Sequence, residues 1–136
     1  MCLNNLEKFD VKQRIGYVIK IKEGNVYHSL YCHAPEIKTA GLKFGLEWSS
    51  KQIIIKCSNG SDTYKTGWHI FLSRKDAMAY RDLFAQGETI LMVRFRKILA
   101  RGIENFYPYI YNSEGVELIG AKVVISKYIT LLKEIK

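Results

Sequence analysis

GWHIFLSRKDAMAY (residues 67–80) places a short apolar strand directly before a capped helix. Ser73 is a typical N-cap residue, and Asp76 three positions later completes an S-x-x-D capping box. Gly87 is well placed to end the helix, because glycine readily adopts the left-handed backbone of a helix C-terminus. The spacing therefore predicts one main helix at about 74–86, with an apolar face formed by Ala77, Tyr80 and Phe84.

Strand patterns dominate the rest of the chain. Apolar and polar residues alternate over 15–22 and again over 89–97, as in strands with one face on a core. Gly24 and Asn25 provide a tight turn, so the first of these strands is expected to return as a hairpin over 26–32. The Leu91, Val93 and Phe95 face of the second strand should lie on the core, with Met92, Arg94 and Arg96 on the opposite face.

Three further segments extend the sheet. The β-branched run over 51–57 predicts a strand, and 106–111 should form an edge strand or an extended loop, because Pro108 cannot donate to a ladder. The stretch 121–132 fits one bent strand, two strands or a terminal helix. The fold class we predict is α+β, a mostly antiparallel β-sheet with one main helix.

Length and composition indicate one globular domain. The 136 residues are 48% hydrophobic and 25% charged, which is not the composition of a disordered chain. We expect a flexible arm over 1–13 and a single α+β domain over 14–136. No apolar run approaches the roughly 20 residues that span a bilayer, and no signal peptide is evident, so we expect a cytoplasmic protein without a membrane partner. The three cysteines show no C-x-x-C spacing, which favours free thiols, no metal site and no cofactor.

The formal charge of +8 points to an anionic partner. Arg94 and Arg96 share one face of a predicted strand, while Tyr107, Tyr109 and Tyr111 would share a face of another. Such a set could combine phosphate contacts with base stacking. We therefore expect a non-catalytic binding or regulatory module for nucleic acid, another anionic macromolecule or a protein; the sequence leaves its oligomeric state open.

His69 is the leading candidate for a catalytic residue. Strand alternation places it on the same face as Phe71 and opposite Trp68 and Ile70. No acid or cysteine near it in sequence would orient the ring, so a structural role is the first interpretation. His28 could join it only through tertiary folding.

Cys2 is a second candidate. If Met1 were removed, Cys2 would carry both a thiol and an α-amino group that could act as its base. This arrangement resembles N-terminal-cysteine enzymes such as the class II glutamine amidotransferases and the proteins that crosslink to abasic DNA, which often begin Met-Cys-Gly. Here Leu3 follows, and an ordinary thiol in a mobile arm is the first interpretation.

Two broader resemblances concern larger parts of the chain. Met1-Cys2-Leu3, the strand 67–71 and the closing Lys133-Glu134-Ile135 resemble a loose group of small bacterial and phage-type proteins that implies no activity. The segments 27–29 and 67–73 resemble, more weakly, ADP-ribosyltransferase-like domains. That likeness implies an alternative function, a small-molecule enzyme with an NAD-like pocket that uses His28 and His69, although only Glu104, Glu114 and Glu117 stand as loop candidates for its glutamate.

Overall fold

The computed structural model describes residues 3–24, 26–28, 44–50, 52–57, 59–84, 87–105, 111–112, 115–116 and 120–135. These residues form one helix and eleven strands. In chain order the elements are β1 Asn5–Leu6, β2 Ile15–Glu23, β3 Val26–His28, β4 Glu47–Ser49, β5 Ile54–Lys56, β6 Thr63–Lys65, β7 Trp68–Phe71, α1 Arg74–Phe84, β8 Thr89–Asn105, β9 Tyr111–Asn112, β10 Gly115–Val116 and β11 Gly120–Ile135. The one helix in these residues is not long and apolar enough to cross a membrane.

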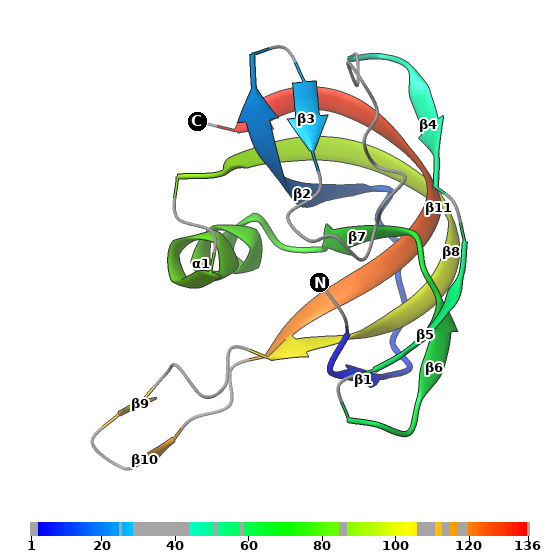
Figure 1. The fold of residues 1–136 in the computed structure, drawn as a ribbon, viewed down its shortest axis with the longest axis vertical. Coiled ribbons are helices and arrows are strands. Elements are labelled where there is room, and N and C mark those ends of the chain that lie inside the picture. The colour runs from blue at the N-terminus through cyan, green and yellow to red at the C-terminus, as the bar shows by residue number, and fades with distance from the viewer. Residues whose placement is uncertain are drawn as a thin grey trace.

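Two long strands, β8 and β11, form the frame of the molecule (Figure 1). They pair antiparallel from Gly120 opposite Asn105 to Ile135 opposite Ile90, with two register shifts that let them bend. β11 also pairs with β7, β7 with β2, and β2 with β8. These four pairings close into a ring, so the central strands form a small barrel that has β1, β3 and β4 attached.

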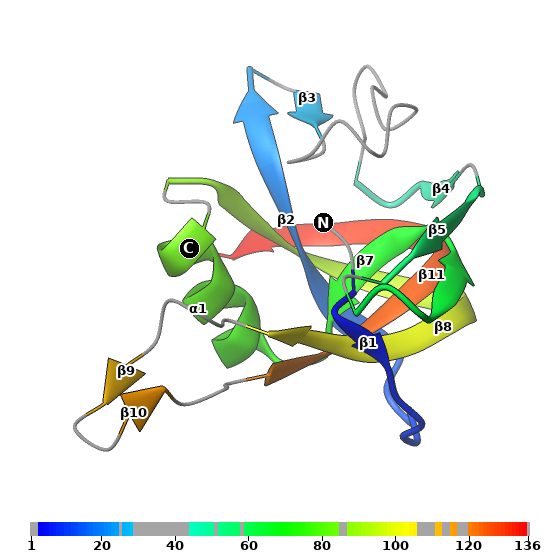
Figure 2. The ribbon, with the colours of Figure 1, turned by 60° about the horizontal axis from the view of Figure 1, so that its bottom comes forward.

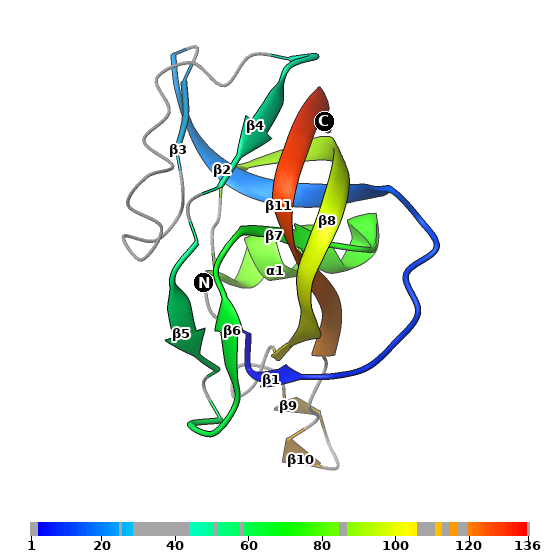
Figure 3. The same cartoon turned by 90° about the vertical axis from the view of Figure 1, so that its right-hand side faces the viewer.

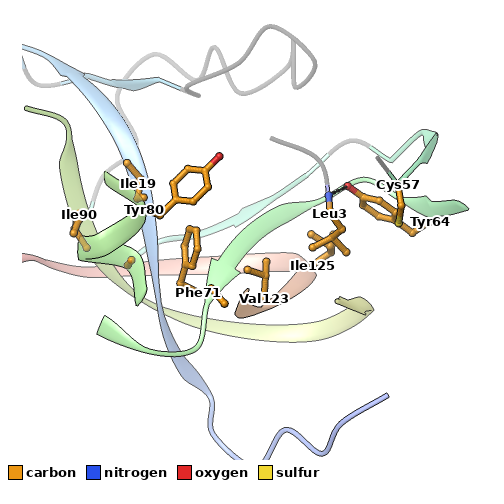
Figure 4. Packing of buried hydrophobic residues seen from close by; sticks show 11 residues of the cluster. Leu3, Ile19, Cys57, Tyr64, Phe71, Tyr80, Ile90, Val123 and Ile125 are labelled. Carbon is orange, nitrogen blue, oxygen red and sulfur yellow. Dashed lines mark hydrogen bonds between the residues drawn. The ribbon is translucent and has the colours of Figure 1, made fainter. Parts of the chain in front are cut away.

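Buried side chains fill two regions on the two faces of this sheet. The inner cluster lies inside the ring and contains Val18, Tyr27, Trp68, Ile70, Leu91, Val93, Phe95, Val124, Ile129 and Leu131. The outer cluster lies on the other face, where α1 and the hairpin of β5 and β6 cover the strands (Figures 2 and 4). It contains Leu3, Ile19, Cys57, Tyr64, Phe71, Ala77, Tyr80, Ile90, Ala121, Val123 and Ile125. β7 contributes to both clusters, which explains its run of buried residues.

The helix predicted from the sequence is confirmed. The Asp76 backbone N–H donates to the Ser73 hydroxyl at 3.3 Å, as an N-cap requires. Ala77 and Tyr80 are buried and Phe84 packs against the outer cluster. Gly87 follows the helix with a φ of 83°, in the left-handed region.

The strand predictions hold in outline but miss lengths. The core face of Leu91, Val93 and Phe95 is confirmed. β8 continues to Asn105, well past the expected end at 97, and 120–135 is one long strand rather than a helix. Tyr107, Pro108 and Tyr109 lie outside the described residues, so the prediction for 106–111 is not tested there.

The amino-terminal residues take part in the sheet. Asn5 and Leu6 form β1, which pairs with β8, and the Leu3 side chain is fully buried. A flexible arm therefore does not describe residues 3–6, because hydrogen bonds to β8 and contacts with the outer cluster hold them in place. The domain boundary at residue 14 stays a prediction.

Candidate functional site

A short chain of polar contacts links His69 to the amino-terminal residues. The Leu3 backbone N–H donates to the Tyr64 hydroxyl oxygen at 3.0 Å. The same hydroxyl lies 3.4 Å from Nε2 of His69. Figure 4 shows the Tyr64 hydroxyl directed at the Leu3 nitrogen, beside Ile125. The Tyr64 hydroxyl thus accepts from Leu3 and lies near the imidazole, and we name Leu3, Tyr64 and His69 the His69 relay.

The electrostatics of the relay keep His69 neutral. Burial lowers the pKa of His69 to about 3, and the positive charges of the chain's amino terminus and of Lys20 act in the same direction. A hydrogen bond with the Gly67 backbone opposes this shift. His69 as a residue is half-buried, and its imidazole is neutral at neutral pH.

Glu104 is a second unusual group on the same face of the sheet. It lies opposite Ala121 on β11, while His69 lies opposite Ile125 on that strand. The residue is only 4% exposed, and its Oε1 has no hydrogen-bond partner among the described residues. Burial raises the pKa of Glu104 to about 8, partly offset by the charge of the amino terminus. The carboxyl is therefore mostly protonated at neutral pH.

Lys20 is a buried titratable group on the side of the inner cluster, as Glu104 is on the side of the outer cluster. It is 6% exposed, and its Nζ lies 5.2 Å from the centre of the Trp68 ring. Burial lowers the pKa of Lys20 to about 8, and the Trp68 indole N–H has no hydrogen-bond partner in the described part of the chain. The cation–π contact compensates in part for the lost hydration of the ammonium group.

A basic hollow lies between β8 and the segment that joins β1 to β2. It measures about 430 Å³ and is lined by Val11, Lys12, Gln13, Arg14, Phe95, Arg96, Lys97, Ile98 and Arg101. Figure 3 shows this segment arching past β8. The lining contains five basic residues and no acidic one. Arg96 donates through Nε and Nη2 to the two carboxylate oxygens of Glu47, whereas the other four have no ion pair within the described part of the chain.

A larger, open hollow of about 970 Å³ adjoins the basic hollow and shares Val11, Lys12 and Arg101 with it. Its lining also includes the three carboxylates of Glu7, Asp10 and Asp62 and reaches Tyr64. The mixture of charges makes it less suited to an anion than the basic hollow.

The binding residues predicted from the sequence are only partly brought together. Arg94 and Arg96 are exposed on β8 as expected, but only Arg96 lines the basic hollow. The Arg96 guanidinium lies 3.9 Å from the centre of the Tyr128 ring. Tyr107 and Tyr109 lie outside the described residues, and Tyr111 is described in its backbone alone. Stacking by these three tyrosines stays a prediction.

The structure tests the predicted catalytic residues only in part. His69 lies in the relay, and its face shared with Phe71 is confirmed. The side chain of His28 and all of Cys2 lie outside what the structure describes, so joint catalysis by His28 and His69 is not tested. Among the described residues, no group of three or more His, Cys, Asp or Glu side chains could hold a metal ion.

Comparison with known proteins gave no family model, curated protein or solved structure that matches this chain. Sequence reasoning did not group Lys12, Arg14, Lys97 and Arg101, or Tyr64 with His69. Arg14 reaches β8 because its carbonyl accepts from the Phe95 backbone N–H at 2.9 Å, a contact across 81 positions of sequence with no local signature.

Proposed function

We propose that the protein binds nucleic acid through the basic hollow. The observation that carries this proposal is a set of four cations on one concave surface, Lys12, Arg14, Lys97 and Arg101. Among the described residues, none of the four has a carboxylate partner and no acidic residue lines this surface. Unpaired arginine and lysine side chains gain more from a phosphate than paired ones, because no existing ion pair has to be broken.

The shape of the hollow favours a phosphodiester chain over other anionic partners. A bilayer is flat and would meet the outward-facing basic residues rather than those inside a concavity. A nucleic-acid backbone carries a charge at each nucleotide, so consecutive phosphates can meet several cations along one groove. Arg94 lies on β8 just beyond the hollow and extends the positive surface.

The backbone at Lys97 supports the same interpretation. Among the described residues, Lys97 is the one non-glycine residue with a positive φ, at 59°. A lysine in this conformation costs about 1 kcal/mol or more, and such residues are enriched at functional sites. The conformation lies on the hollow side of β8, near the point where the strand changes register with β11.

Titration of labelled single-stranded and duplex nucleic acid at several salt concentrations tests the proposal. If about four phosphates are neutralised, a fourfold rise in salt should weaken duplex binding by roughly 100-fold. The variant Lys97→Asn removes one charge, while asparagine tolerates the positive φ. It should reduce the slope of log Kd against log salt by about 1.

Lys75→Asn is the matched control, because Lys75 is exposed on α1 and lines neither hollow. Its salt slope should equal that of the wild type. Absence of binding at low salt, or equal slopes for the Lys97 and Lys75 variants, would overturn the proposal.

A further inference from the structure

The larger hollow offers an apolar surface beside the basic hollow. The apolar aliphatic and phenylalanine residues of its lining are all half-buried: Leu6, Phe9, Val11, Leu99 and Ala100. Phe9 and Val11 also pack against the inner cluster, so the core holds them in place. A fixed apolar surface of this kind suits a flat, uncharged ring better than a phosphate.

Phe9 is the residue of the larger hollow that best suits a nucleobase. Bases stack on aromatic side chains with little regard to their sequence. Tyr64, the other aromatic residue of the lining, is only 5% exposed, which leaves little of its ring for stacking. Nζ of the exposed Lys122 lies 5.3 Å from the centre of the Phe9 ring, so a further cation stands where a strand stacked on Phe9 would carry its phosphates.

The acidic residues of the larger hollow favour bases over phosphates. Glu7 and Asp10 are exposed and have no ion pair within the described part of the chain. Carboxylates repel phosphates but accept hydrogen bonds from the N–H groups of bases. The basic hollow, which shares Val11, Lys12 and Arg101 with the larger one, has the opposite preference. The two adjoining hollows therefore match the two parts of a nucleotide chain.

We propose that the protein binds single-stranded nucleic acid in preference to duplexes, with phosphates in the basic hollow and an unpaired base against Phe9 in the larger hollow. This inference rests on the nucleic-acid binding proposed above and names the class of nucleic acid. The segment that joins β1 to β2 borders both hollows, so one strand can contact both along it (Figure 3). A duplex holds its bases stacked and paired, and one of them reaches Phe9 only after it is flipped out at a cost in free energy.

The test compares one labelled, unstructured oligonucleotide with the duplex that it forms with its complement, at one low salt concentration, as DNA and as RNA. The single strand should bind at least about tenfold more tightly than the duplex with DNA or with RNA. A smaller preference with both, or tighter binding of the duplex, overturns this inference while nucleic-acid binding stands. Absence of any binding overturns both.

Phe9→Leu tests the place assigned to the base. Leucine keeps an apolar side chain against the inner cluster but removes the ring on which a base stacks. The variant should bind the single strand about fivefold or more weakly, with an unchanged salt slope because no charge is lost. Its duplex binding should stay at the wild-type level, which also shows that the variant is folded.

Phe44→Leu is the matched control, because Phe44 is 47% exposed and lines neither hollow. It should leave the affinities for single strand and duplex unchanged. If the Phe9 and Phe44 variants bind the single strand alike, or if Phe9→Leu weakens duplex binding equally, no unpaired base stacks on Phe9 and the inference fails.

Discussion

Replacing Gly102 with alanine should loosen the amino-terminal strand from the sheet. A Cβ at this position would lie 2.4 Å from the backbone oxygen of Asn5 and 2.8 Å from Cδ1 of Leu3. The first contact is with backbone, which cannot rotate away as the end of a side chain can. The chain around β1 must therefore move, or β8 must distort.

The magnitude follows from these two responses. Added methyl groups in a packed region cost about 1–3 kcal/mol. Detachment of the segment would expose the buried Leu3 side chain, worth about 1.5–3 kcal/mol. It would also break the hydrogen bond from the Asn4 N–H to the Ile103 carbonyl, worth about 1 kcal/mol. The protein adopts whichever of the two responses costs less free energy, so we expect Gly102→Ala to lower the free energy of unfolding by about 2 kcal/mol.

Urea unfolding measures the global effect, and amide hydrogen exchange at Asn4 and Glu7 reports whether the segment opens locally. Both amides donate to carbonyls of β8 and should exchange faster in the variant. Gly87→Asn is the control, because no atom lies within 4 Å of a Cβ there and asparagine tolerates the φ of 83°. A Gly102 variant within 0.5 kcal/mol of the wild type, with Asn4 exchange unchanged, would refute the reasoning.

Two further predictions concern the helix cap and pH. Ser73→Ala removes the acceptor of the Asp76 N–H and should cost about 1 kcal/mol in the same urea titration; an unchanged midpoint would contradict the cap. In the folded state Glu104 keeps its proton up to about pH 8, whereas an ordinary glutamate loses it near 4.5. The free energy of unfolding should therefore fall as the pH rises from 6.5 to 8, and Glu104→Gln should make this fall smaller. In the folded state Lys20 loses its proton near pH 8 instead of 10.5. The free energy of unfolding should therefore rise again from pH 8 to 10, and Lys20→Met should abolish this rise.

Local signals account for what the sequence could predict. The cap at Ser73 and the apolar face of α1 depend on residues three or four positions apart, and the core face of β8 depends on alternation. The full length of β8 could not be predicted from alternation, because Ala100, Arg101 and Gly102 interrupt the alternating pattern. β11 holds this part of β8 in strand conformation through pairing with residues 20 or more positions away.

The candidate sites depend almost entirely on such distant contacts. His69 was recognisable as a histidine on a core strand, but its contact with Tyr64 depends on the turn between β6 and β7, and that of Tyr64 with Leu3 spans 61 positions. The basic residues were visible as a net charge of +8, yet only the pairing of β2 with β8 places Arg14 beside Lys97. Composition predicts the sign of a partner's charge and not the surface that would meet it.

One stretch of chain, residues 3–14, contributes to both candidate sites. Its beginning is fixed at Tyr64 in the outer cluster, and its end supplies Lys12 and Arg14 to the basic hollow. The end is held independently of β1, because the Arg14 carbonyl accepts from Phe95 and Ile15 begins the pairing of β2 with β8. Gly102→Ala should therefore speed amide exchange at Asn4 while it leaves the salt dependence of nucleic-acid binding intact. A change in both would show that the two ends of this segment depend on one another.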